Sequence, residues 1–75
     1  MLYELVIYVC LASAPPSRET CEPARLKEPL LSEQACADRY DADADAIAEA
    51  IAPRLRGAAE AGVATFYTCK PKPAV

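Results

Sequence analysis

The four cysteines of this 75-residue chain are the residues with the most distinctive chemistry. They are Cys10, Cys21, Cys36 and Cys69. Cysteine sulfur can close a disulfide, ligate zinc as a thiolate or exchange electrons in a C-x-x-C site. Zinc sites usually combine close cysteine pairs with histidine, but the chain has no histidine and no two cysteines close together. We therefore expect two structural disulfides and no metal. Free buried thiols and a thiol metal-binding protein are the alternatives.

Acidic side chains are the second group that could carry chemistry. The middle of the chain holds Asp38, Asp41, Asp43, Asp45 and Glu49. Carboxylates act as catalytic acids or bases when burial shifts their pKa, which an exposed helix face does not provide. The chain also lacks a glycine-rich phosphate loop, since Gly57 and Gly62 are its two glycines. We expect no enzymatic activity and no cofactor.

The acidic group itself has two interpretations. It is either the solvated face of a helix or a phosphate-mimicking surface, as in an acidic inhibitor of a nucleic-acid-binding protein. Direct nucleic-acid binding is disfavoured, because the chain has 8 basic against 11 acidic residues and a net charge of −3. Binding to phosphates needs clustered Lys and Arg that displace counterions.

Length limits how stable the core can be. A chain of this size forms one domain that buries only about 60% of the unfolded surface, so it usually needs disulfides, a metal or a partner. Much of the 53% hydrophobic content is alanine, which buries little area. The core must therefore come from the larger aliphatic and aromatic side chains.

The N-terminal segment Leu2 to Leu11 is the clearest strand, because it is rich in β-branched and aromatic residues. Its odd-numbered residues from position 3 are wholly apolar and should face the core. The small residues 12–14 resemble a signal-peptide cleavage site, but no Lys or Arg precedes the apolar run and Glu4 interrupts it. We expect a retained strand, too short to span a membrane, and cytoplasmic synthesis that can end in an oxidising or extracellular particle.

Two further strands and a helix complete the predicted secondary structure. Cys21 to Glu28 reads as an edge strand, because Pro23 cannot donate to a ladder. Ser32 is a suitable N-cap for a helix that runs to Glu60 and is kinked or split by Pro53 near Ala52. The helix carries an apolar stripe: Cys36, Tyr40, Ala44, Ile47, Ile51 and Leu55. Gly62 is placed to stop it.

The last strand is Val63 to Lys70, which we expect Pro71 and Pro73 to end. The order predicts an α+β fold: a small disulfide-stapled ββαβ domain over residues 1–70, followed by an extended arm, 71–75. Its three-stranded, mainly antiparallel sheet has the order 2-1-3, with one kinked helix on one face. In this topology Cys10 lies beside Cys21 and Cys36 lies near Cys69, so we predict those two disulfides.

The sheet face away from the helix is the predicted interaction surface. Leu2, Val6 and Tyr8 share that face of the first strand, and Phe66 joins them if Cys69 faces the helix. Contiguous exposed aromatic and apolar side chains are typical of an interface. The alternative is ordinary surface exposure.

The stretch Glu4 to Ala12, ELVIYVCLA, followed by Cys21, Cys36 and Cys69, resembles a loose group of small four-cysteine proteobacterial proteins. The resemblance covers the first strand and the cysteine frame. It implies no catalytic residues and favours an accessory protein, including one of phage origin.

These observations favour a non-enzymatic protein–protein interaction module. It would act as an accessory or structural subunit of a larger assembly, such as a phage-like particle, and would self-associate or dissolve poorly when alone. The alternatives are the acidic inhibitor and the thiol metal-binding protein.

Overall fold

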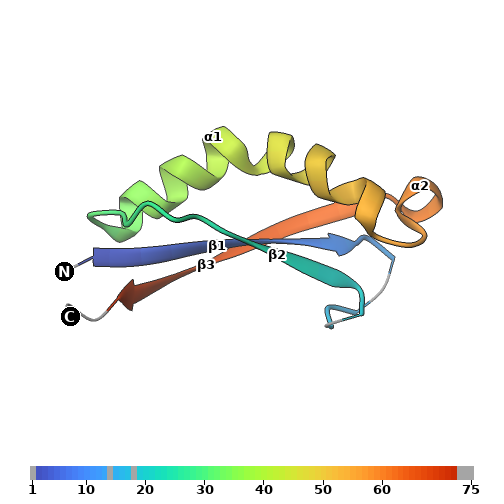
Figure 1. Cartoon of the computed structure of the whole chain (residues 1–75), viewed down its shortest axis with the longest axis horizontal. Coiled ribbons are helices and arrows are strands. Elements are labelled where there is room, and N and C mark those ends of the chain that lie inside the picture. The colour runs from blue at the N-terminus through green and yellow to red at the C-terminus, as the bar shows by residue number, and fades with distance from the viewer. Residues whose placement is uncertain (1, 14, 18, 73–75) are drawn as a thin grey trace.

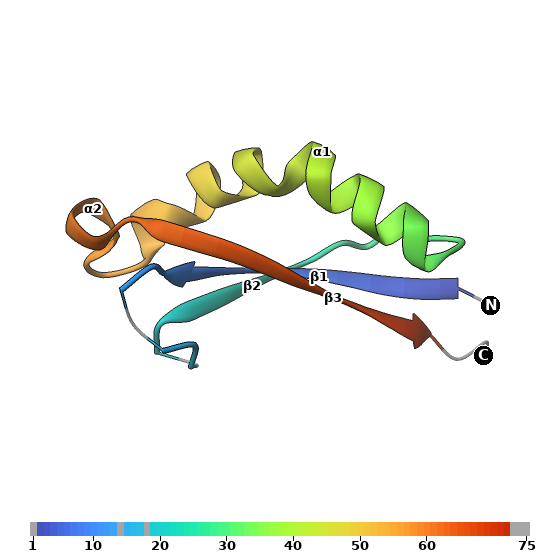
Figure 2. The same ribbon diagram turned by 180° about the vertical axis from the view of Figure 1, so that it is seen from behind.

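The computed structural model describes residues 2–13, 15–17 and 19–72. Three antiparallel strands, β1 (Leu2–Leu11), β2 (Cys21–Arg25) and β3 (Val63–Lys72), form one sheet in the order β2-β1-β3. Helix α1 (Glu33–Ile51) lies along one face of the sheet, and the other face carries no helix (Figures 1 and 2). The predicted α+β class, strand order and one-sided helix are confirmed.

Strand β1 is the centre of the sheet and supplies most of the core. Leu5, Ile7 and Val9 are fully buried beneath α1, as their alternation along the strand predicts. Fully burying such side chains stabilises a fold by about 1.5–3 kcal/mol each. The segment that resembles a signal peptide is therefore a structural strand here.

Helix α1 begins where the sequence indicates. The Ser32 hydroxyl accepts a hydrogen bond from the Ala35 amide at 3.0 Å, which satisfies one of the free amides of the first turn. Cys36, Ala44 and Ile51 of the apolar stripe are buried against the sheet. The stripe thus attaches the helix to β1 and β3.

The helix ends at Ile51 because Pro53 cannot continue its hydrogen bonding. A 3-10 turn, η1 (Ala52–Arg54), and the short helix α2 (Ala58–Ala61) replace the expected helical run to Glu60. Gly57 has a φ of 91°, a left-handed conformation that separates the two pieces. Gly62, with a φ of 75°, ends α2 as predicted.

Strand β2 is shorter than the predicted Cys21 to Glu28. It ends at Arg25, residues 27–28 bend away from the sheet, and the chain returns at Leu30 to form an isolated bridge with Tyr3. The bend inserts two residues into the pairing with β1. As predicted, β2 contains Pro23 and lies at an edge of the sheet.

Strand β3 is longer than predicted and includes Pro71, which pairs opposite Tyr3. The backbone of Tyr3 is hydrogen-bonded to Leu30 on the other side of β1. Position 71 therefore directs its nitrogen away from β1, where proline loses no ladder hydrogen bond. The expectation of an arm from residue 71 is wrong for 71–72, and 73–75 lie outside the described residues.

Both predicted disulfides are present. Cys10–Cys21 joins directly opposed residues of β1 and β2, with a Cα–Cα distance of 4.0 Å. Cys36–Cys69 joins the first turn of α1 to β3, with a Cα–Cα distance of 6.1 Å. One crosslink therefore lies at the hairpin end of the sheet and the other ties the helix to the sheet near the opposite end.

Candidate functional site

The sheet face turned away from α1, which we call the outer face, is formed by alternate residues of all three strands. On β1 these are Leu2, Glu4, Val6, Tyr8 and Cys10; on β2, Cys21, Pro23 and Arg25; on β3, Ala64, Phe66, Thr68, Lys70 and Lys72. Cys69 packs against the core cluster on the helix side. The face assignment for Phe66 therefore agrees with the prediction.

Tyr8 and Phe66 form the aromatic centre of the outer face. They are directly opposed in the β1–β3 pairing, and their rings stack with centroids 4.8 Å apart and planes 12° apart. Tyr8 is half-buried and Phe66 is 41% exposed. Stacking between neighbouring strands holds both rings in one orientation, so they present a preorganised apolar surface.

Val6 shares this face but is only 4% exposed, so the expectation that it is uncovered is wrong. Arg25 lies directly opposite Val6, and its Nη1 lies 3.2 Å from Oε1 of Glu4, the next residue on the same face. This ion pair, with Tyr8 on the other side, surrounds the small side chain. Val6 therefore packs beneath its neighbours on the outer face and offers a partner little exposed surface.

Leu2 is 39% exposed, but the structure does not bring it to the aromatic pair. It lies opposite Lys72 at the far end of β1. Leu2 lies six positions along the strand from Tyr8, which corresponds to about 20 Å. Of the four predicted contact residues, Tyr8 and Phe66 are the two that the structure places together at an exposed surface.

A groove of about 630 Å³ opens beside the aromatic pair. The strands contribute Tyr8, Phe66, Cys21, Pro23 and Arg25 to its lining, and the connection between β1 and β2 contributes Pro16 and Ser17. In Figure 1 this connection descends on the side of the sheet away from α1. The sequence did not predict the groove, because its lining residues come from three strands and the connection between β1 and β2 and meet only in the folded chain.

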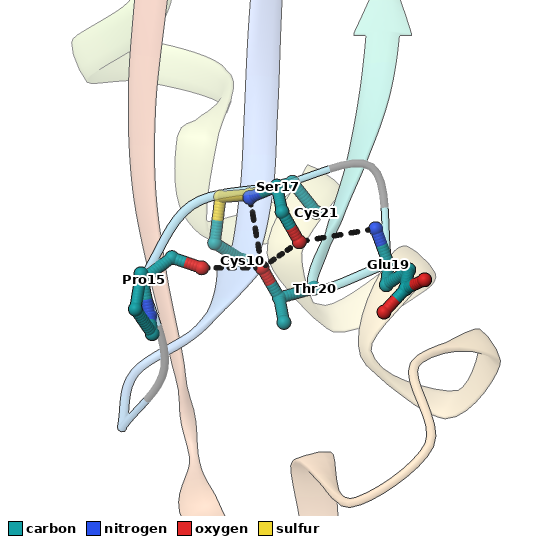
Figure 3. The surroundings of a disulfide bond; sticks show 6 residues. All are labelled: Cys10, Pro15, Ser17, Glu19, Thr20 and Cys21. Atoms are coloured by element: carbon teal, nitrogen blue, oxygen red, sulfur yellow. Dashed lines mark hydrogen bonds between the residues drawn. A yellow bond between two sulfur atoms is a disulfide. The ribbon is translucent and has the colours of Figure 1, made fainter.

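Hydrogen bonds hold the loop wall of the groove in place (Figure 3). The Thr20 hydroxyl donates to the Pro15 carbonyl at 2.8 Å and accepts from the Ser17 amide at 3.0 Å. The Cys21 amide donates to the Ser17 carbonyl at 3.0 Å, next to the Cys10–Cys21 disulfide. The pattern Ser17-x-x-Thr20, in which short hydroxyl side chains bond the local backbone, was the available sequence signal.

The acidic side of α1 lies away from the outer face. Asp38, Asp41, Asp45 and Glu49 are exposed to solvent. Arg39 lies among them and pairs with Asp43 and Glu28; the hydrogen bond to Asp43 raises the pKa of Arg39. A fixed positive charge therefore interrupts the acidic surface.

Both cysteine pairs are disulfides, so none of the four sulfurs is available as a thiolate ligand. Among the described residues no group of three or more His, Cys, Asp or Glu is arranged to hold a metal. No helix in the described ranges is long and apolar enough to cross a membrane.

Comparison of the chain with protein-family models, with curated proteins and with solved structures found no match. Function is therefore inferred from the outer face and its groove.

Proposed function

We propose that the protein is a non-enzymatic interaction module that binds a partner protein through the groove on its outer face. In this role it serves as an accessory or structural subunit of a larger assembly, of which a phage-like particle is one example. The observation that carries the proposal is the stacked pair Tyr8 and Phe66 at the rim of a groove walled by a hydrogen-bonded loop.

Rigid aromatic side chains beside a preformed groove are the usual material of interface hot spots. They offer a large contact area and lose little conformational entropy on binding. The Tyr8–Phe66 stack and the Cys10–Cys21 disulfide already restrict the conformation of the groove in the absence of a partner. This preorganisation supports binding of a partner segment without folding of the groove itself.

Charge favours an acidic partner. The outer face carries Arg25, Lys70 and Lys72 against Glu4, although the whole chain has a net charge of −3. Arg25 lines the groove, and its side chain is 66% exposed despite its ion pair with Glu4. The occupant that fits is a segment with an aromatic or aliphatic side chain for the groove and a carboxylate for Arg25.

Selection from a displayed random-peptide library on the immobilised, oxidised protein tests the proposal. We expect the bound peptides to share an aromatic or aliphatic residue beside Asp or Glu. A purified consensus peptide should bind Phe66→Ala at least about 30-fold more weakly, which corresponds to the loss of a hot spot. Its affinity should fall with added salt, because exposed charges contribute.

Leu31→Ala is the matched control, because Leu31 is an apolar side chain that is 80% exposed and lies outside the outer face. It should bind the consensus peptide as the unmodified protein does. The proposal fails if no consensus emerges, or if Phe66→Ala and Leu31→Ala bind the peptide equally well.

A further inference from the structure

Strand β3 has an edge whose backbone groups lack partners. The hydrogen bonds of Leu11 to Thr20 and of Leu26 to Leu5 show that odd-numbered residues of β1 direct their backbone toward β2. Even-numbered residues of β1 therefore bond to β3, where they pair with Ala64, Phe66, Thr68 and Lys70. The alternate positions of β3 direct their amides and carbonyls away from the sheet.

These outward positions are Val63, Thr65, Tyr67 and Cys69, followed by Pro71, which has no amide hydrogen. No backbone hydrogen bond reaches the four amides from the residues that the structure describes. The segment Val63 to Cys69 also carries no charge and no proline, and it is rich in β-branched and aromatic residues. Such an edge readily pairs with a strand of another chain.

The other edge of the sheet is protected. On β2 the Cys21 amide is bonded to the Ser17 carbonyl, and Pro23 has no amide hydrogen to offer. Only Arg25 keeps an outward amide on that strand. The two edges thus differ: one is closed by the loop and a proline, and the other is open along seven residues.

We propose that β3 pairs with β3 of a second copy, antiparallel and centred on Phe66. In this register Val63 lies opposite Cys69 of the second copy, and Thr65 lies opposite Tyr67 of the second copy. The arrangement has twofold symmetry, so every outward amide and carbonyl of the segment finds a partner. About eight backbone hydrogen bonds form, two for each directly bonded pair.

Proline selects this register over those shifted toward Lys70, because a pairing centred on Tyr67 or Thr68 would place Pro71 opposite Val63 or Thr65 of the second copy, whose carbonyl needs an amide hydrogen. A shift that centres the pairing on Lys70 would oppose like charges directly and place Pro71 opposite a residue that needs its amide hydrogen. Centred on Phe66, the pairing ends before Pro71. The lysines of the two copies then lie at opposite ends of the dimer.

The pairing also explains why Phe66 is exposed. Residues at the symmetry axis lie opposite themselves, so the Phe66 rings of the two copies become neighbours on the outer face. The Tyr8–Phe66 stack would then continue across the axis and join the outer faces of two copies. This inference uses the backbone of the edge and stands independently of the proposed groove partner.

Two variants at one position test the edge. Tyr67→Pro removes an outward amide hydrogen, whereas Tyr67→Ala keeps it and removes the same ring. Pro23 and Pro71 already occupy outward positions in this sheet, so the fold accommodates proline there. Sedimentation equilibrium over a range of concentrations should show a dimer for the unmodified chain and for Tyr67→Ala.

Tyr67→Pro should raise the dimer dissociation constant about 30-fold, because symmetry removes two hydrogen bonds. Circular dichroism and non-reducing peptide mapping confirm that each variant is folded. Amide hydrogen exchange of the unmodified chain tests the pairing without any substitution. At high protein concentration the Thr65 and Tyr67 amides should be protected from exchange, and at low concentration they should exchange. A monomer at all concentrations, or a dimer whose Thr65 and Tyr67 amides exchange freely, overturns the inference.

Discussion

The Tyr40 hydroxyl of α1 lies 2.6 Å from Oγ1 of Thr65 on β3. The ring of Tyr40 also contacts that of Tyr67, with centroids 4.6 Å apart. These contacts join the middle of the helix to the middle of an edge strand, which lies at the margin of the core. They add a polar anchor to the Cys36–Cys69 disulfide on the same two elements.

Removing this hydrogen bond should measurably lower stability. We expect Tyr40→Phe to reduce the free energy of unfolding by about 1 kcal/mol, because it leaves the half-buried Thr65 hydroxyl without its partner. Urea denaturation of the oxidised protein measures the change. Tyr3→Phe is the control, since no described residue hydrogen-bonds to the Tyr3 hydroxyl; an equal loss in both variants would contradict the assignment.

The two disulfides should contribute unequally. The Cys36–Cys69 crosslink spans 33 positions and Cys10–Cys21 spans 11, so the chain-entropy model assigns about 4 and about 3 kcal/mol to them. Replacing each pair by alanine and comparing denaturation midpoints tests the order. Non-reducing peptide mapping of the unmodified chain should recover these two pairs, and a Cys10–Cys36 or Cys10–Cys69 peptide would contradict the fold.

The Tyr8–Phe66 stack should appear as an interaction energy. In a double-mutant cycle of Tyr8→Ala and Phe66→Ala, we expect a coupling of about 1 kcal/mol in the free energy of unfolding. Tyr8→Ala combined with Leu31→Ala should be additive. If either single aromatic variant unfolds the domain, these residues belong to the core and the outer face has been misassigned.

The acidic side of α1 should not be needed for peptide binding in the groove. Replacing Asp41 and Asp45 by Asn should leave the affinity for the consensus peptide within about twofold, because these exposed charges lie on the other side of the sheet from the groove. Isothermal titration at two salt concentrations checks the result. A large, salt-sensitive loss of binding would instead favour the acidic-inhibitor alternative.

Local patterns were sufficient to predict most of the fold. Alternation along β1 identified its buried face, Ser32 marked the start of α1, and Pro53 marked the break in the helical run, although the run was expected to continue to Glu60. Strand directions then determined the cysteine pairing, because each predicted pair lies at one end of the sheet. These features depend on residues close in sequence or on simple topology.

The features that the sequence did not predict depend on pairing between distant segments. The burial of Val6 results from Arg25 and Glu4 on neighbouring positions of the folded sheet. Pro71 continues β3 because the backbone of Tyr3 is already bonded on its other side. One segment alone does not show which residues of β1 bond to β2 and which bond to β3. It also does not show that the loop between β1 and β2 lies over the outer face.

The disulfides close two separate covalent rings, residues 10–21 and residues 36–69. The backbone of residues 22–35 is the covalent connection between the two rings. A protease cut at exposed Arg56 opens the second ring but leaves one covalent molecule. A cut at exposed Lys27, between the rings, divides the oxidised protein into two pieces, one with β1 and β2 and the other with α1 and β3. The ladder between β1 and β3, the Tyr3–Leu30 bridge, the Arg54–Glu22 ion pair and the buried side chains beneath α1 then hold the two pieces together without a covalent bond. We therefore expect the protein to form a two-fragment complementation pair without the alteration of any residue.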